Sequence, residues 1–286
     1  MNVLEQLVEQ LALEKLEENL FRGQTQDLGW GAVFGGHVLG QALSAATQTV
    51  PKERHVHSMH AFFLRPGDVT RPILYTVDRI RDGGSFTTRR VVAVQHGEPI
   101  FNMAASFQLD EPGFDHMESM PEAPDPDTLP DDRERLRVGY DQLPTNLRKM
   151  STGLRPIEMR AVDTEDDLIH PSKRPAYRRV WLKARGALGD DPAVHASLLA
   201  YASDYSFITT SLLPHGATFL TPKMQVASLD HVMWFHRPFR LDDWLLHVMD
   251  SPSASNARGL VRGRVFTRAG VLVASTAQEG LIRQRK

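Results

Sequence analysis

Hydrophobic and polar residues alternate along many short segments of this chain. Such alternation predicts β-strands, because successive strand side chains point to opposite faces. The clearest example is 179–184, where Val180, Leu182 and Ala184 share one predicted face. Comparable patterns predict strands in the first half at 20–22, 57–64, 73–80, 85–95 and 100–108. In the second half they predict strands at 157–161, 179–184, 225–236, 244–250, 257–267 and 271–281.

Three other segments carry apolar residues at helical spacing. Residues 3–11 form an amphipathic pattern, and the glycine-rich run that includes Gly35 and Gly36 leads into an apolar segment ending near residue 46. Helical spacing returns over 194–212, a segment that includes Asp204. Each of the two later helices precedes a series of strands. We therefore predict an α+β fold with two central helices, each wrapped by a mostly antiparallel sheet.

The chain repeats itself. The sequence Phe-Phe-Leu-Arg-Pro at 62–66 returns as Trp-Phe-His-Arg-Pro at 234–238, an offset of 172 positions (234 − 62). Arg90 falls on Arg262 at the same offset, and 99–101 falls on 272–274 at an offset of 173. A tandem duplication also suits the length of 286 residues, which is about two ordinary domains.

Three polar residues of the second copy have apolar or glycine counterparts in the first. The matched pairs are Ser228 with Val56, Gln278 with Ala105 and, more loosely, Asp204 with Gly36. Because only one copy keeps the polar residues, the duplication suggests one retained active site. We expect this site in the second half of the chain.

A proline-rich acidic segment separates the two copies. Residues 110–132 contain five prolines and nine acidic residues with little to bury, which predicts an exposed linker. We therefore divide the chain into a first unit at 1–110, a linker with a connecting helix at 111–150, and a second unit at 151–286. The second unit carries the candidate catalytic residues, and the first unit lacks them.

Composition excludes several functions. With a net charge of −2 the chain has no overall basic field for nucleic acid or an anionic membrane, which favours a small ligand. The absence of cysteine excludes disulfides, thiolate metal sites and a catalytic thiol. No apolar run approaches the length of a membrane span, and the first residues lack the pattern of a secretory signal. We predict a cytoplasmic protein.

Four longer strings allow an identification. They are VFGGHVLGQAL at 33–43, HAFFLRPGD at 60–68, LDHVMWFHRPF at 229–239 and SASNARGLVRG at 253–263. With these strings the chain resembles the acyl-CoA thioesterase II family over nearly its whole length. The resemblance implies a tandem double hotdog fold and hydrolysis of medium- to long-chain acyl-CoA to free fatty acid and coenzyme A, without metal or cofactor. It also implies a homo-oligomer, a dimer or tetramer of double hotdogs.

The resemblance places the catalytic constellation on Asp204, Ser228 and Gln278. Asp204 can accept a proton from the attacking water, and burial at the start of an apolar helix would raise its pKa toward useful basicity. Ser228 and Gln278 supply the donors and the acceptor that hold the water in one orientation. Direct attack by water is the preferred route. A carboxylate nucleophile that forms an anhydride would use the same residues.

The developing oxyanion needs hydrogen-bond donors. Backbone N–H groups at a helix start have no partner within the helix, and the macrodipole favours negative charge there. The glycine-rich entry at Gly35 and Gly36 is one candidate for this role, and the entry around Asp204 is another. The sequence does not choose between them.

Other polar residues support further hypotheses. Arg258 and Arg262 could bind the phosphates of coenzyme A, although a solvated strand face would show the same residues. His55 and His57 share one strand face, but no third metal ligand of suitable spacing accompanies them. His57 is also an alternative catalytic base.

Two other functions compete with a thioesterase. A hydratase of the hotdog class would need a His five residues after the Asp, where this chain has Thr209. A non-catalytic acyl-CoA sensor would lack the polar trio, which is intact here. Both alternatives are therefore disfavoured by particular residues.

Overall fold

The computed structural model of the protein describes residues 2–29, 31–134, 148, 155–163 and 169–285. The first half comprises α1 (Val3–Ala12), β1 (Glu14–Glu17), β2 (Leu20–Gly23), α2 (Gly35–Thr47), β3 (Arg54–Phe63), β4 (Ile73–Asp82), β5 (Phe86–Gln95) and β6 (Glu98–Leu109). The second half comprises η1 (Pro126–Thr128), β7 (Ile157–Ala161), β8 (Tyr177–Ala184), α5 (Pro192–Ser203), η3 (Ile208–His215), β9 (Met224–Ser228), β10 (Asp230–Phe235), β11 (Leu245–Ser255), β12 (Arg258–Thr267) and β13 (Leu272–Gln284). The predicted strands are present, although 225–236 divides into β9 and β10. The short β1 was missed because all its side chains are exposed, which leaves no alternation to detect.

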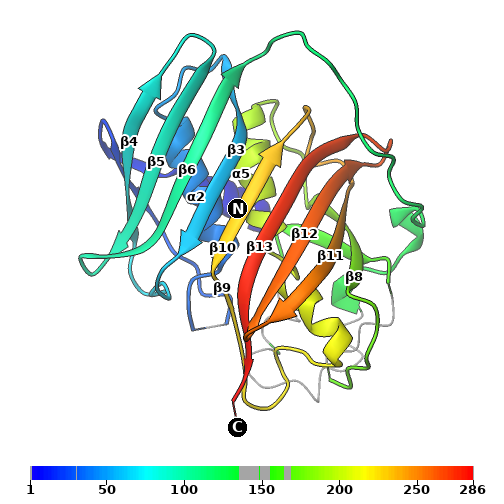
Figure 1. The fold of residues 1–286 in the computed structure, drawn as a ribbon. Helices are drawn as coiled ribbons and strands as arrows, with labels where there is room; N and C mark the ends of the chain where they lie inside the picture. Colours follow the sequence, from blue (N-terminus) through cyan, green and yellow to red (C-terminus); the bar gives the residue numbers. More distant parts are fainter. Residues whose placement is uncertain (1, 30, 135–147, 149–154, 164–168, 286) are drawn as a thin grey trace.

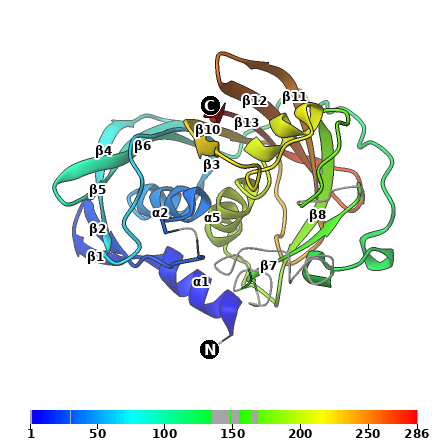
Figure 2. The same ribbon diagram turned by 90° about the horizontal axis from the view of Figure 1, so that it is seen from below.

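The strands form one antiparallel sheet that curves around the two central helices (Figure 1, Figure 2). From the centre outwards, the first half has the order β3-β6-β5-β4-β2-β1. The second half has the corresponding order β10-β13-β12-β11-β8-β7, with β9 added beside β13. The predicted α+β duplication is therefore confirmed.

The pairing of β3 with β10 joins the two halves and is symmetric about one residue pair. The paired residues are His60 with Val232, Phe62 with Asp230 and Ser58 with Trp234. The offset of 172 maps His60 onto Val232 and exchanges the other two pairs, so a local two-fold axis passes through the His60 and Val232 pair. One strand further out, the corresponding pairs are Phe63 with Phe101 and Phe235 with Ala274, which preserves the offset of 173.

The continuous helical spacing predicted over 194–212 is interrupted in the structure. α5 ends at Ser203, Asp204 is its C-cap residue, and η3 is a separate 3₁₀ helix. Between them Ser206 has a φ of 59°, a left-handed conformation that an α-helix cannot continue. Asp204 therefore closes a helix, and the expectation that it opens one was wrong. Its loose alignment with Gly36 was wrong as well, because Gly36 lies in the first turn of α2.

The two central helices lie side by side and run antiparallel inside the curved sheet (Figure 2). A Cβ atom built on Gly36 would lie 2.2 Å from the carbonyl oxygen of Tyr201, and one on Gly40 would lie 2.9 Å from that of Ser197. The two backbones thus approach too closely for a side chain at either glycine. As a result, the N-terminus of α2 meets the C-terminus of α5, where Asp204 lies. None of the described helices is long and apolar enough to cross a membrane.

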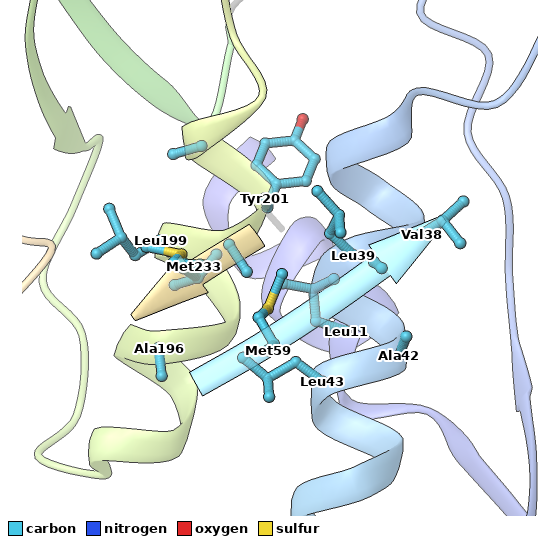
Figure 3. Packing of buried hydrophobic residues seen from close by; sticks show 14 of the residues in the cluster. Leu11, Val38, Leu39, Ala42, Leu43, Met59, Ala196, Leu199, Tyr201 and Met233 are labelled. Atoms are coloured by element: carbon cyan, nitrogen blue, oxygen red, sulfur yellow. The ribbon is translucent and has the colours of Figure 1, made fainter. Parts of the chain in front are cut away.

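Apolar side chains from both halves form one core around the helix pair. Leu39 and Leu43 of α2, Leu199 of α5, Met59 of β3 and Met233 of β10 are fully buried in it (Figure 3). Met59 and Met233 are register partners across the central strand pair. Because this core is continuous, each half buries the apolar surface of the other.

The segment predicted as an exposed linker is docked against the second half. It leaves β6 and crosses to the far side of the molecule (Figure 1). Met120, Ala123 and Leu129 pack on a second buried cluster that includes Trp181. Trp181 Nε1 also donates a hydrogen bond to the carbonyl oxygen of Pro124 at 3.0 Å. Most of the segment is exposed as predicted, but its few apolar residues cover the outer face of the sheet.

Ion pairs hold the same segment in place. The linker carboxylates of Asp115, Glu118 and Asp125 pair with arginines of the second half, namely Arg237, Arg264 and Arg268. These three acidic residues of the linker are therefore paired, although the sequence pattern predicted a solvated segment. The connecting helix falls largely outside the described residues, and the unit boundaries at 110 and 151 stay a prediction.

The close approach of α2 and α5 makes a testable prediction. We expect Gly40→Ala to lower the free energy of unfolding by up to about 2 kcal/mol, because overpacking costs about 1–3 kcal/mol and helix propensity returns about 1 kcal/mol. Denaturant unfolding would measure the change. Gly84→Ala is the matched control, since a Cβ there meets no atom within 4 Å. Equal stability of the two variants would contradict this account of the helix contact.

Candidate active site

The three predicted catalytic residues come together at the end of α5. Gln278 Nε2, in β13, donates a hydrogen bond to Asp204 Oδ1 at 2.9 Å. The hydroxyl of Ser228, the last residue of β9, donates a second hydrogen bond to the same carboxylate. The structure thus joins three elements of the second half at one carboxylate.

A further donor to this carboxylate comes from the first half of the chain. The backbone N–H of Gly36 donates a hydrogen bond to Asp204. At the neighbouring Gly35, a Cβ atom would lie 2.7 Å from Asp204 Oδ2, so the carboxylate fits only against glycine. The start of α2 was proposed as a donor site for an oxyanion, and here it binds the carboxylate itself.

The start of α2 is open because its N-cap residue has no polar side chain. α1 and α5 begin with side-chain caps from Asn2 and Asp191, but the N-cap residue of α2 is Phe34 and makes no such hydrogen bond. The first N–H groups of a helix have no acceptor within the helix. Asp204 supplies that acceptor from a distant part of the chain and places its charge at the positive end of the α2 macrodipole.

Opposing effects set the pKa of Asp204. Burial is the largest and raises the pKa, whereas the donors from Gln278, Gly36 and Ser228 lower it. The net result is a pKa above the ordinary value of an aspartate. Such a carboxylate is a stronger base than a solvated one. Taken as a whole residue, Asp204 is half-buried.

Several aromatic side chains lie in the neighbourhood of Asp204. Phe34 stacks on Tyr205 with ring centroids 4.8 Å apart, and the Tyr205 hydroxyl lies 2.8 Å from that of Tyr201. The Phe63 ring lies 3.1 Å from a Cβ built on Gly35. Burial raises the pKa of Tyr205, and the charge of the adjacent Asp204 raises it further.

Gln278 contacts buried polar residues that no sequence pattern predicted. Gln278 Nε2 lies 3.3 Å from His231 Nδ1, and His231 Nε2 lies 3.0 Å from Ser203 Oγ. All three side chains are fully buried. One signal was present in the sequence: the alternation in β10 places His231 on the same inward face as Met233, where an apolar residue is usual.

The histidines considered earlier belong to a different environment. His57 Nε2 lies 2.8 Å from Ser106 Oγ, and His55 lies 3.9 Å from Asp110. Burial lowers the pKa of His57. Within the described part of the chain, no three His, Cys, Asp or Glu side chains are grouped as metal ligands. The hydrogen bonds of the described residues do not connect either histidine to Asp204.

The candidate arginines form ion pairs with carboxylates of the sheet. The pairs are Arg258 with Glu279 at 2.9 Å, Arg262 with Asp250 at 2.6 Å and, in the first half, Arg90 with Asp78 at 2.6 Å. The last two pairs occupy equivalent positions in the duplicated fold. Because the first half lacks the polar trio, a pair present in both halves is explained by cross-strand pairing alone.

The fold and this site define a class of thioester hydrolase, and comparisons with known proteins agree. The family model "Acyl-CoA thioesterase N-terminal domain" matches residues 25–108, and the model "Acyl-CoA thioesterase" matches residues 154–281. Acyl-CoA thioesterase 2 of Haemophilus influenzae is 43% identical over 282 residues, which cover 99% of this chain and 98% of that protein. The chain belongs to the acyl-CoA thioesterase family, and it is an acyl-CoA thioesterase.

Solved structures agree with the fold. The crystal structure of the acyl-CoA thioesterase II TesB2 from Mycobacterium marinum is 42% identical, with a TM-score of 0.80 over 98% of this chain and 99% of that one. A protein described as having a hot dog fold, from Alicyclobacillus acidocaldarius, is 19% identical with a TM-score of 0.78 over 98% and 99% of the two chains. The expected tandem double hotdog fold is confirmed.

Burial of the Asp204 charge predicts a pH-dependent stability difference. Because the pKa is raised in the folded state, that state binds a proton more readily than the unfolded state. The charged carboxylate therefore destabilises the fold above the raised pKa, and this penalty disappears as the pH falls toward the ordinary value. We expect the melting temperature of the wild type to rise relative to Asp204→Asn as the pH is lowered through this range. A difference in melting temperature between the two proteins that does not change with pH, or that changes in the opposite direction, would contradict the raised pKa of Asp204.

Proposed function

We propose that this thioesterase hydrolyses medium- and long-chain acyl-CoA by direct attack of a water molecule that Asp204 activates. The observation that carries this proposal is the Asp204 carboxylate, whose pKa burial raises and toward which Gln278, Gly36 and Ser228 donate at the end of a buried helix. Asp204 takes the proton from water as the oxygen attacks the thioester carbonyl. The coenzyme A sulfur then leaves as a thiolate, because a thiol of pKa about 8.5 is a good leaving group.

Gln278 and Ser228 orient the water in this mechanism. The Gln278 amide donates to Asp204 through Nε2, while its buried Oε1 has no hydrogen-bond partner among the described residues. A buried acceptor without a partner favours a bound water. Water that donates to this oxygen and to the carboxylate directs a lone pair at the substrate. The Ser228 hydroxyl fixes the carboxylate from another direction.

The N-terminus of α2 is the proposed oxyanion site. When Asp204 takes up a proton, its negative charge disappears, and a new negative charge develops on the thioester oxygen. In this proposal the N–H groups at the first turn of α2, around Gly35 and Gly36, point toward both the Asp204 carboxylate and the thioester oxygen. Their orientation does not change during the reaction. The same fixed dipole then stabilises the charge before and after the proton moves.

Family resemblance supports two further proposals. A broad preference for medium and long acyl chains follows from it. Assembly into a homo-oligomer is supported by exposed apolar residues on the outer face of the central strands, where Phe62 and Trp234 are 55% and 38% exposed. A cytoplasmic location stays a prediction.

The two competing functions make different predictions about the residues and the activity of this protein. A hydratase requires a histidine where Thr209 stands, and Thr209 donates to the carbonyl oxygen of Ser206 at 2.9 Å instead. An acyl-CoA sensor would bind the substrate without turnover.

Thiol release from palmitoyl-CoA and decanoyl-CoA tests the catalytic assignment. We expect turnover by the wild type and a loss of at least about 100-fold in kcat in Asp204→Asn, because the amide cannot act as a base. Circular dichroism would verify that both proteins are folded. Equal activity of the wild type and Asp204→Asn would indicate His57 as the next candidate for the base. Binding without turnover by the wild type would indicate a sensor.

Isotope-labelled water distinguishes direct attack from an anhydride. In a single turnover in ¹⁸O water, direct attack places the label in the released fatty acid and leaves Asp204 unlabelled. An anhydride opened by water at Asp204 would leave the label in the carboxylate of this residue. Mass spectrometry of the peptide that contains Asp204 would detect it.

Binding of coenzyme A phosphates by Arg258 and Arg262 stays a proposal. Both side chains are substantially exposed, but each already pairs with a carboxylate. If Arg258 contacts a phosphate, Arg258→Glu should raise KM about tenfold with little change in kcat. Arg90→Glu in the first half is the matched control for reversing a strand charge. An unchanged KM in Arg258→Glu would assign Arg258 to the sheet alone.

A further inference from the structure

We propose that His231 is a positioning residue that locks the amide of Gln278 in the orientation needed for catalysis. This inference rests on the proposed roles of Asp204 and Gln278. Gln278 Nε2 lies between two acceptors, Asp204 Oδ1 at 2.9 Å and His231 Nδ1 at 3.3 Å. An amide nitrogen has two N–H groups, and this arrangement uses both.

The direction of each hydrogen bond in this cluster follows from its chemistry. The Gln278 amide nitrogen can only donate, so His231 Nδ1 must accept and carries no proton. The single proton of a neutral imidazole then lies on Nε2, which donates to Ser203 Oγ at 3.0 Å. Ser203 in turn donates to the carbonyl oxygen of Ala200 at 2.9 Å. The carbonyl at the end of α5 thus selects one tautomer of His231.

The surroundings keep His231 neutral. Burial and the nearby His247 of β11 lower its pKa to about 3. Phe207 separates the two imidazoles, with its ring centroid 5.6 Å from His231 and 5.3 Å from His247. Asp204 is the carboxylate of this cluster and reaches His231 only through the Gln278 amide. A protonated His231 would present a donor to the amide nitrogen and break the chain of hydrogen bonds.

The locked amide has a consequence for the bound water. If the amide rotated by half a turn, Oε1 would face Asp204 Oδ1 and His231 Nδ1, and both are acceptors. His231 therefore makes the rotated state unfavourable, and Oε1 stays free to accept from water. Without His231, one N–H of Gln278 would lose its partner, and the amide would be held by Asp204 alone.

Two substitutions at His231 separate positioning from packing. Asn places an oxygen acceptor near the position of Nδ1, whereas Leu places a methyl group there. We expect His231→Leu to lose about 10- to 100-fold in kcat with little change in KM, and His231→Asn to recover most of that loss. His247→Leu is the matched control, because it removes the other buried imidazole against Phe207 but no contact to Gln278.

The pH dependence of the rate provides a readout that packing alone would not move. Gln278 lowers the pKa of Asp204 by donating to it. With the amide no longer locked, the acid limb of the kcat profile in His231→Leu should move to higher pH. His231→Asn and His247→Leu should keep the limb of the wild type. Equal behaviour of the Leu and Asn variants at His231 would overturn the proposal.

A direct measurement of the tautomer covers the case in which His231→Leu does not fold. ¹⁵N NMR of the histidine rings, assigned by comparison with His231→Asn, should show His231 protonated at Nε2 only. A proton on Nδ1 would refute the proposed direction of the hydrogen bonds. Gln278→Ala tests the role of Gln278 separately from that of His231. Full activity in Gln278→Ala would remove the proposed role of Gln278 itself. An inactive Gln278→Ala together with a fully active His231→Leu would reject only the positioning role of His231.

Discussion

The contact between the start of α2 and the end of α5 is the constraint on which the rest of this structure depends. Gly36 and Gly40 remove the side chains that would separate the two helices, and the backbones approach to van der Waals distance. This places an uncapped helix N-terminus directly against the residue that follows α5. The candidate active site is therefore a property of the interface between the two copies, because Asp204 belongs to the second copy and the start of α2 to the first.

The same contact resolves an apparent conflict in the chemistry of Asp204. A buried carboxylate without donors would be protonated and useless as a base, and a fully solvated one would be a weak base. At this site burial raises the pKa while Gly36, Ser228 and Gln278 limit the rise. An aspartate next to a helix end is usually only a cap. Asp204 is the C-cap residue of α5, and its side chain also lies at the uncapped start of α2, which brings it into the candidate site.

The duplication shows how one fold came to hold a single asymmetric site. The local axis at His60 and Val232 relates the two halves, yet the position of Gln278 is an alanine in the first half and that of Ser228 is a valine. The first half has instead kept a structural role: α2 supplies its N-terminus. The linker adds a second asymmetry, because Met120, Ala123 and Leu129 pack on the second half and Asp125 pairs with Arg268 there.

The sequence by itself determined the strands and the duplication with its offsets, and its resemblance to a family proposed Asp204, Ser228 and Gln278 as a set. The strands and the duplication could be predicted because they rest on local periodicity and on direct comparison of two segments of the chain. Only the tertiary structure decided that Asp204 ends a helix, that Gly36 donates to it, that the linker is docked, and that His231 lies against the Gln278 amide. Each of these depends on which distant segments pack together. Periodicity indicates that one face of a helix or strand is buried, but it does not indicate which distant segment packs against that face.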